Sequence, residues 1–441
     1  MPFESEMGTP RKTSGSSDLP ERYRQVRVAT EMACVPLSPE DMVVQSMPDA
    51  SPAKWHLAHT TWFFETFVLS RSSLGDYQSF HPEFNFLFNS YYDAVGSRHP
   101  RPLRGLLTRP SLDEVRRYRE HVDREMSEIL PRLAPTDNLI AMVEIGLNHE
   151  QQHLELLLTD VKHLFSRNPS RPCYRELTMS GDRAVGPMKW SSFKEGVYWI
   201  GHAGEAECEE FCFDNERPRH RVFLEPFEIG TRPVSCGEYL AFMDDNGYGR
   251  PDLWLADGWS ARQREGWQAP LYWERHGDCW KSFTLGGMRA IAVNEPVLHV
   301  SFYEADAFAR WAGSRLPTET EWEVACTSQL PRLRVGLTGL PPTDSGSFEP
   351  CRLHPAPMTD DRDGFFDDVW TWTQSAYSPY PGFKPTAGAI GEYNGKFMCN
   401  QFVLRGGSCL TPRSHLRATY RNFFPPEARW QFTGLRLARS C

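Results

Sequence analysis

The first 168 residues contain long segments in which apolar residues recur at helical spacing, separated by polar connections. Each segment is preceded by a helix start signal, either a capping side chain or a proline in the first turn. The predicted helices run over residues 21–33, from Ser51-Pro52, from the capping box Ser111–Glu114, and from Asp137 to just before Asn168. Four such helices predict an up-down bundle over residues 20–168. Residues 1–19, rich in Ser, Gly, Pro and charge, predict a disordered tail.

The pattern changes after residue 168. Residues 169–195 are polar and aperiodic, and they predict a linker. From residue 196 to 441, short β-like runs lie between long loops rich in Gly, Pro and Trp, with helical segments at 235–245, 301–313 and 318–326. We therefore expect an α+β second domain over 196–441, and an α+β, two-domain protein overall.

Composition narrows the class of protein. The 441 residues are 40% apolar with a formal net charge of −9, and no apolar run reaches the roughly 20 residues that a membrane-spanning helix needs. A membrane protein is therefore excluded, and an acidic chain has no general attraction to nucleic acid or anionic membranes. The 11 cysteines show no paired spacing, and the first twenty residues hold no apolar signal segment. We expect reduced thiols and a cytoplasmic location.

His149-Glu-Gln-Gln-His153, in the longest predicted helix, is the sharpest local signal. Residues four apart share a helix face, so both imidazoles can reach one metal ion. The same string fits a structural histidine pair, and it also matches the zinc-protease pattern in which Glu150 is a general base. No third histidine follows at the spacing of one large protease class, which argues against a protease.

A second histidine pair, His56 and His59, lies between Trp55 and Trp62 on the second predicted helix. Either histidine can pack within an aromatic core layer, or it can complete a three-histidine site with the long helix. The spacing does not choose between them. Three neutral imidazoles leave open positions on a redox metal for a thiolate and O₂, as at non-haem iron.

A loop between helices also carries reactive side chains. Tyr91 or Tyr92 can supply a proton-donating phenol, and Arg98 and Arg101 can hold a carboxylate. The alternative is a solvated linker whose tyrosines pack on the bundle. Near the C-terminus, residues 420–436 are dense in aromatics and form either a small second core or a pocket for a cation or a ring.

Several motifs occur together in the order typical of one family. The chain contains WHLAHTTWFFE, NSYYDAVG, HEQQH, NEPVLHVSFYEADAFARWAGSRLPTETEWE, YNGKFMCNQFVLRGGS and TYRNFFPPEARWQFTGLRLAR. Over residues 20 to 441 it resembles the ergothioneine-biosynthesis sulfoxide synthases, the EgtB family. The resemblance implies a DinB-like four-helix bundle followed by a domain similar to formylglycine-generating enzymes, of C-type-lectin-like fold. It displaces the protease hypothesis.

Members of this family are mononuclear non-haem iron(II) enzymes with three histidine ligands. They use O₂ to join a cysteine-type thiol to C2 of the imidazole of N-alpha-trimethylhistidine (hercynine), with formation of a C–S bond and a sulfoxide. By motif position, the resemblance assigns His59, His149 and His153 as the iron ligands. It leaves His56 as an outer or packing residue.

The resemblance also assigns substrate contacts. Gln152 contacts the histidine-derived substrate, Asn422 its carboxylate, and Phe423, with Phe424 beside it, its trimethylammonium group. Members that use gamma-glutamylcysteine have Asp in place of Phe424, whereas this chain has the double-tyrosine loop of members thought to use free cysteine. We therefore expect cysteine as the thiol substrate, with gamma-glutamylcysteine as the alternative.

The catalytic phenol is then Tyr91 or Tyr92, with Tyr377 as a further candidate. True formylglycine-generating enzymes have two cysteines soon after the RGGS turn, where this chain has Cys409 too early and Thr411 and Leu416 near the expected positions. That activity is therefore not expected.

Three alternatives remain open. The first two keep the iron site: an ovothiol-type synthase, against which the lack of a C-terminal methyltransferase-like domain argues, and a selenoneine-type synthase. The third is a non-catalytic ligand-binding module.

Overall fold

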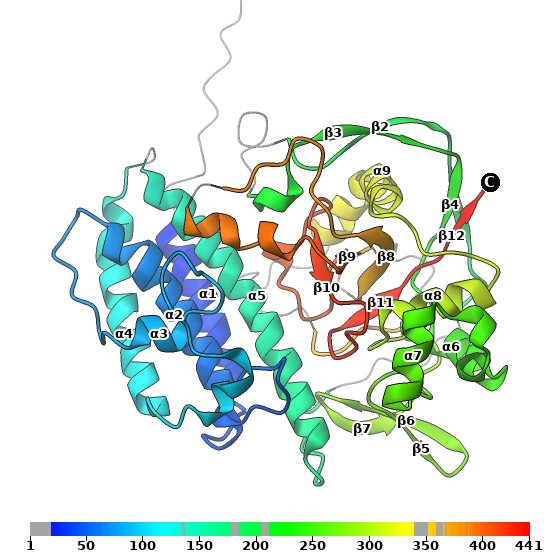
Figure 1. Ribbon diagram of the computed structural model, residues 1–441, viewed down its shortest axis with the longest axis horizontal. Coiled ribbons are helices and arrows are strands. Elements are labelled where there is room, and N and C mark those ends of the chain that lie inside the picture. The colour runs from blue at the N-terminus through cyan, green and yellow to red at the C-terminus, as the bar shows by residue number, and fades with distance from the viewer. Residues whose placement is uncertain are drawn as a thin grey trace, which may run out of the picture.

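The computed structural model describes residues 19–134, 137–177, 185–203, 211–338, 352–358, 365–366, 368–386 and 388–441, with the backbone alone for 329–338. A helical bundle is followed by a domain of short strands, helices and long loops (Figure 1). The expected α+β, two-domain architecture is confirmed. The predicted tail, 1–19, lies outside the described residues except for Leu19, where the first helix begins.

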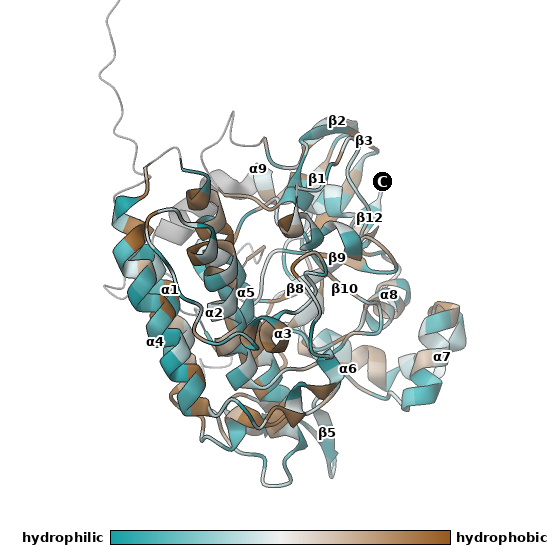
Figure 2. Cartoon of the chain, turned by 60° about the vertical axis from the view of Figure 1, so that its left-hand side comes forward, coloured by the Kyte–Doolittle hydropathy of each residue, from teal (hydrophilic) through white to brown (hydrophobic). Residues whose placement is uncertain are grey.

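Among the described residues, four long helices make up the bundle: α1 (Leu19–Cys34), α2 (Ala53–Phe67), α4 (Leu112–Ile129) and α5 (Asn138–Arg167). A short helix, α3 (Phe84–Phe88), lies between α2 and α4 in sequence. Nearly all of α2 is buried, as expected for a central helix, whereas α4 buries one stripe and exposes polar residues (Figure 2). None of the described helices combines the length and the apolar character of a membrane span.

Two of the expected helix caps are confirmed and one is wrong. The box Ser111–Glu114 caps α4, and Asp137 caps α5 by accepting from a backbone N–H of the first turn. Ser51 does not cap α2, because its N–H donates to Asp160 and its hydroxyl accepts from Arg104. Tertiary partners therefore take the groups that the sequence pattern assigned to a cap.

The second domain consists of small sheets with helices around them. Its strands are β1 (Trp190–Phe193), β2 (Gly196–Ile200), β3 (His220–Leu224), β4 (Phe227–Gly230), β5 (Trp273–His276), β6 (Cys279–Thr284), β7 (Gly287–Ala290), β8 (Trp370–Ala376), β9 (Phe402–Arg405), β10 (Asn422–Phe424), β11 (Thr433–Leu435) and β12 (Ala438–Ser440). The sheet orders are β1-β4-β12, β10-β9-β8-β11, β2-β3 and β5-β6-β7. Among these described strands, β8 and β11 pair in parallel and the other pairs are antiparallel. The helices are α6 (Cys236–Asp244), α7 (Ala256–Glu265), α8 (Phe302–Trp311) and α9 (Glu319–Thr338).

The structure confirms the expected strands and adds elements that the pattern missed. Helix α7 is short, lacks an apolar stripe and protrudes from the domain, and the β5-β6-β7 sheet was also not expected (Figure 2). Strand β1 lies within the range 169–195 that predicted a linker, where it pairs with β4. Its sequence, WSSF, does not alternate clearly, so only the tertiary pairing defines it as a strand. Residues 178–184 of that range lie outside the described residues.

Helix α5 joins the two domains (Figure 1). On its side facing the second domain, the buried carboxylate of Glu155 accepts hydrogen bonds from the hydroxyls of Ser408 and Thr411 and from the indole of Trp370, at 2.6, 2.7 and 2.8 Å. Further hydrogen bonds along the same helix link Asn148 to His415 and Gln151 to Ser414. The helix that carries the HEQQH string is therefore also the interface between the domains.

Lys162 of α5 is buried in this interface. Its Nζ lies 2.6 Å from Nε2 of His299 and above the rings of Tyr272 and Phe432. Within the described residues no carboxylate forms an ion pair with it, and burial lowers its pKa to about 7. The unfolded chain, with a lysine pKa of roughly 10.4, binds more protons between these values. The buried charge of Lys162 therefore destabilises the folded protein fully below pH 7, and this destabilisation disappears as the pH rises toward 10.

Replacing Lys162 with Met is expected to stabilise the protein at pH 7 because it removes this buried cation. The gain in unfolding free energy should be about 3 kcal/mol larger at pH 7 than at pH 9.5. Urea unfolding of both proteins at the two pH values measures the difference, with exposed Lys194→Met as the control that shows no such change. An equal gain at both pH values would mean that Lys162 keeps an ordinary pKa.

Candidate metal centre

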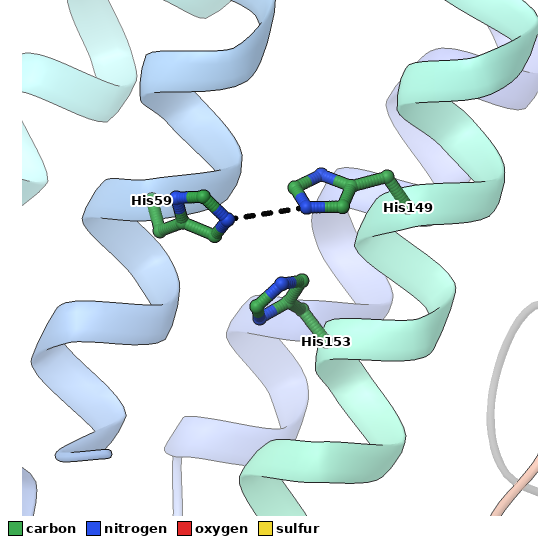
Figure 3. Close-up of side chains that lie close together, drawn as sticks. All are labelled: His59, His149 and His153. Atoms are coloured by element: carbon green, nitrogen blue, oxygen red, sulfur yellow. Dashed lines mark hydrogen bonds between the residues drawn. The ribbon is translucent and has the colours of Figure 1, made fainter. Parts of the chain in front are cut away.

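Three histidines from two bundle helices converge between α2 and α5. His59 of α2 points toward His149 and His153, which lie one turn apart on α5 (Figure 3). One nitrogen from each ring lies within 4.8 Å of the others, and Nε2 of His59 is 3.2 Å from Nε2 of His149. The i, i+4 spacing on α5 and the facing side of α2 thus bring three imidazoles to one point.

Neighbouring groups orient two of these rings. Nδ1 of His59 lies 2.6 Å from the carbonyl oxygen of Phe88, so Nδ1 carries the proton and Nε2 keeps its lone pair. Nδ1 of His153 lies 2.9 Å from Nδ1 of His56, whose Nε2 lies 3.0 Å from the carboxylate of Asp160. Because Asp160 accepts the Nε2 proton of His56, His56 accepts from His153 and leaves Nε2 of His153 available. His56 thus lies outside the cluster and orients one of its members.

The electrostatics of the cluster favour neutral imidazoles. Burial lowers the pKa of His149 to about 3 and the pKa values of His59 and His153 well below the usual range. Nδ1 of His149 is also buried without a hydrogen-bond partner among the described residues. Neutral imidazoles with converging lone pairs are ligands that divalent transition metals prefer. The donor set therefore fits a metal ion with three nitrogen ligands.

Glu150, the candidate base of the protease hypothesis, lies elsewhere. Its buried carboxylate pairs with Arg27 at 2.9 Å and with Arg119 at 2.6 Å in the bundle core. Burial alone would raise the pKa of Glu150, but Arg119 and Arg27 hold it below its ordinary value. A carboxylate held by two buried guanidinium groups is not available to activate water, so the geometry contradicts a zinc-protease role.

Aromatic residues of the second domain cover the histidine cluster. The Tyr393 ring lies 5.6 Å from the His149 ring, and Phe213 packs against Tyr393 at 5.5 Å. Gln152, beside His153, donates to the hydroxyl of Tyr420. The sequence analysis did not single out Tyr393, whose only signal was its place in the YNGKF motif. The site therefore contains side chains from both domains.

Tyr91 and Tyr92 lie next to this cover. The Tyr91 ring is 5.0 Å from that of Tyr92 and 5.8 Å from that of Tyr393, and Tyr92 packs against Trp62, which stacks on His59. Burial raises the pKa of both loop tyrosines, so both phenols carry their proton. The Tyr92 hydroxyl is fully buried and forms no hydrogen bond of good geometry with the described residues.

Phe423 belongs to the same aromatic system. Its ring stacks on Tyr377 at 4.0 Å and lies 5.9 Å from Phe397, which contacts the Tyr91 ring at 5.3 Å. The hydroxyl of Tyr377 accepts from the side chain of Asn215. The C-terminal aromatics thus reach the tyrosine loop through Phe397.

The neighbours of Phe423 have other contacts. Phe424, one residue further along β10, packs toward Trp430 at 6.3 Å, and the side-chain oxygen of Asn422 accepts from the N–H of Phe423. Their roles as substrate contacts stay predictions.

Arg98 and Arg101, the predicted carboxylate ligands, lie at the surface. Arg98 donates to the carbonyl of Ser90 and pairs with Asp93, and Arg101 donates to the carbonyl of Asp49. Each contact occupies part of a guanidinium group. A role in holding a substrate carboxylate stays a prediction for both.

Arg104 is the arginine of this loop that is buried, and the sequence analysis did not assign it a role. Its guanidinium lies 3.3 Å from the centre of the Trp55 ring and donates to the hydroxyls of Ser51 and Ser90. Trp55 in turn stacks on His59 at 4.5 Å. No carboxylate of the described residues pairs with Arg104, and burial lowers its pKa well below the usual range. A buried cation without an anionic partner, one ring away from the cluster, is suited to an anionic ligand.

Comparisons with known proteins agree with the two-domain fold. Residues 22–157 match the DinB superfamily, and residues 192–333 and 361–441 match the sulfatase-modifying factor enzyme 1-like domain. Hercynine oxygenase of Mycobacterium tuberculosis is 33% identical, over 93% of this chain and 96% of that protein. Hercynine oxygenase of Mycolicibacterium smegmatis is 32% identical, over 89% and 92%. Ergothioneine biosynthesis protein 1 of Schizosaccharomyces pombe is 26% identical over 54% of this chain. The chain belongs to the hercynine oxygenase family.

Proposed function

We propose that this protein is an iron(II)- and O₂-dependent sulfoxide synthase that joins cysteine to C2 of hercynine in ergothioneine biosynthesis. The observation that carries the proposal is the convergence of His59, His149 and His153 in a member of the hercynine oxygenase family. One thiol S–H and the imidazole C2–H are lost, a C–S bond forms, one oxygen atom of O₂ becomes the sulfoxide oxygen, and the other leaves as water. The four electrons that O₂ accepts come from the C–S bond formation and from the oxidation of sulfur.

The three histidines would hold the iron, and when bound it supplies thiolate ligation and O₂ activation. The chain's own residues would exclude water and position the substrates. Tyr393 of the second domain lies against His149, and Phe213 packs against Tyr393. Arg104, which pairs with no carboxylate of the described residues, suits the cysteine carboxylate. The aromatic face of Phe423, which lies 5.9 Å from the Phe397 ring, suits a trimethylammonium group, which aromatic faces bind with roughly 0.5–2 kcal/mol.

Tyr91 or Tyr92 is the proposed proton donor, through the phenol Oη. Both phenols are protonated at neutral pH, so either hydroxyl can donate to a group on the substrate. Replacing either tyrosine with Phe is expected to lower the yield of sulfoxide and raise that of cysteine sulfinate, because proton donation separates coupling from plain thiol oxidation. Product analysis by mass measures the ratio. If neither variant changes it, the proton-donor assignment is wrong.

Aerobic incubation with Fe(II), hercynine and either cysteine or gamma-glutamylcysteine tests the function. We expect a hercynine–cysteine sulfoxide of the mass of both substrates plus one oxygen and minus two hydrogens, with cysteine preferred. A product from histidine bonded at C5, or a product only with a selenium donor, would assign a related synthase. Ligand binding without turnover in iron-loaded protein would assign a binding module.

A further inference from the structure

A segment of the second domain holds the tyrosine loop of the bundle through hydrogen bonds and ring contacts. It consists of two short 3₁₀ helices, Ala389–Glu392 and Gly395–Phe397. The carboxylate of Glu392 accepts hydrogen bonds from the backbone N–H groups of Asp93 and Ala94, at 3.0 and 2.9 Å. Asp93 and Ala94 directly follow Tyr91 and Tyr92 in the sequence. They lie almost 300 positions before Glu392.

Lys396 of the same segment contacts the loop with a positive charge, opposite to that of Glu392. Its Nζ donates to the backbone carbonyl of Tyr91, lies 3.3 Å from a carboxylate oxygen of Asp93, and pairs with Glu392 at 3.0 Å. An anion thus meets the N–H groups of the turn, and a cation meets its carbonyl group. The turn also bonds within itself, since the N–H of Asp93 donates to the carbonyl of Tyr91 at 3.1 Å and the Asn89 side chain contacts the backbone of Tyr92. Glu392 and Lys396 add contacts from the second domain to these internal ones.

Two aromatic side chains of the same segment pack on the tyrosines that the turn carries. Phe397 contacts the Tyr91 ring at 5.3 Å, and the Tyr393 ring lies 5.8 Å from that of Tyr91 and 6.5 Å from that of Tyr92. Tyr393 also contacts His149. The backbone contacts therefore set the position of the tyrosine pair relative to a ring that touches the histidine cluster.

We propose that Glu392 and Lys396 are positioning residues that hold the Tyr91–Tyr92 turn in the position needed for catalysis. The second domain thereby fixes the position of the proton-donating phenol. The inference rests on the proposed function. Neither residue touches the reacting atoms, and both act through the backbone of residues 91–94. Because proton transfer needs close alignment, a displacement of about 1 Å can change a rate by about 10²-fold. A loosened turn should let sulfur take both oxygen atoms of O₂, which gives cysteine sulfinate and leaves hercynine unchanged.

The test uses the full-length iron-loaded protein and the variants Glu392→Ala and Lys396→Met. Both side chains are partly exposed, so the fold is not at risk. We expect hydrogen exchange of the Asp93 and Ala94 amides to accelerate in Glu392→Ala. The sulfoxide-to-sulfinate ratio should fall by about 10-fold or more in both variants, while bound iron stays unchanged. The control is Arg310→Met, which breaks an i, i+4 ion pair with Asp306 on α8 and should change neither measurement.

A charge-reversed double variant, Glu392→Lys with Lys396→Glu, separates positioning from simple ion pairing. It keeps the attraction between the two side chains but places each opposite a backbone group of the wrong polarity, so we expect no rescue. Rescue by the double variant would overturn the proposal. Faster hydrogen exchange of the amides with an unchanged product ratio would also overturn it. The contacts of Glu392 and Lys396 with the turn would then have only a structural role. If the wild-type protein makes no sulfoxide, the proposed function fails, and unchanged exchange in Glu392→Ala separately shows that Glu392 does not hold the turn.

Discussion

Replacing His149 with Ala is expected to reduce bound iron to background and to abolish coupling of cysteine to hercynine. The variant removes one of three neutral donors that converge within 4.8 Å, and two imidazoles hold a divalent ion far more weakly than three. Losing several kcal/mol of metal-dependent stabilisation of the transition state corresponds to a rate loss of roughly 10³-fold or more. Metal analysis after Fe(II) loading and product analysis by mass measure the two effects.

Two other histidine variants test whether the loss of iron is specific to the three-histidine cluster. His56 contacts His153 and Asp160 but lies outside the cluster, so His56→Ala should weaken iron affinity by about 10–100-fold without abolishing binding. His121, partly exposed on α4, is the control for adventitious binding, and His121→Ala should leave iron content unchanged. Full iron occupancy in His149→Ala would contradict the assignment of the metal centre.

Replacing Glu150 with Ala is expected to lower the free energy of unfolding by about 3–5 kcal/mol. The variant leaves Arg27 and Arg119, both fully buried, without the carboxylate that they share. Each arginine keeps one further carboxylate partner, Asp123 for Arg27 and Glu31 for Arg119, and each also donates to a threonine hydroxyl. Denaturant unfolding followed by the far-ultraviolet signal of the helices measures the loss.

Glu144 on the same helix provides the matched control. It pairs with Arg22 at 2.6 Å, but both side chains are partly exposed, so Glu144→Ala should cost no more than about 1 kcal/mol. Equal losses of unfolding free energy for Glu150→Ala and Glu144→Ala would show that the buried ion pairs do not contribute the expected stability. If Glu150 were instead a catalytic base, Glu150→Ala would abolish activity while stability stayed the same.

Much of the fold could be predicted from local pattern. The helical spacing of apolar residues and the caps at Ser111 and Asp137 located α4 and α5, because these signals lie within one turn of the helix that they start. The pattern failed where partners distant in sequence define an element. The pairing of β1 with β4 makes a strand from a polar segment, and the β5-β6-β7 sheet is also held by cross-strand pairing.

The candidate site divides in the same way. The i, i+4 spacing placed His149 and His153 on one face of a helix, which local geometry guarantees. Spacing left His56 and His59 open, and family resemblance assigned His59. The structure separates the two by their contacts, since His59 faces His149 whereas His56 lies between His153 and Asp160.

The sequence by itself determined which residues share a helix face, where the long bundle helices run, and the family resemblance of the chain. Only the tertiary structure decided that Glu150 neutralises two arginines, that Arg104 is buried without a carboxylate partner among the described residues, and that Tyr393 contacts His149. The physical reason is that periodicity encodes the environment of a residue on its own element. Charge pairing and ring contacts depend on which elements pack together, and here the second domain, far along the chain, completes the site that the bundle begins.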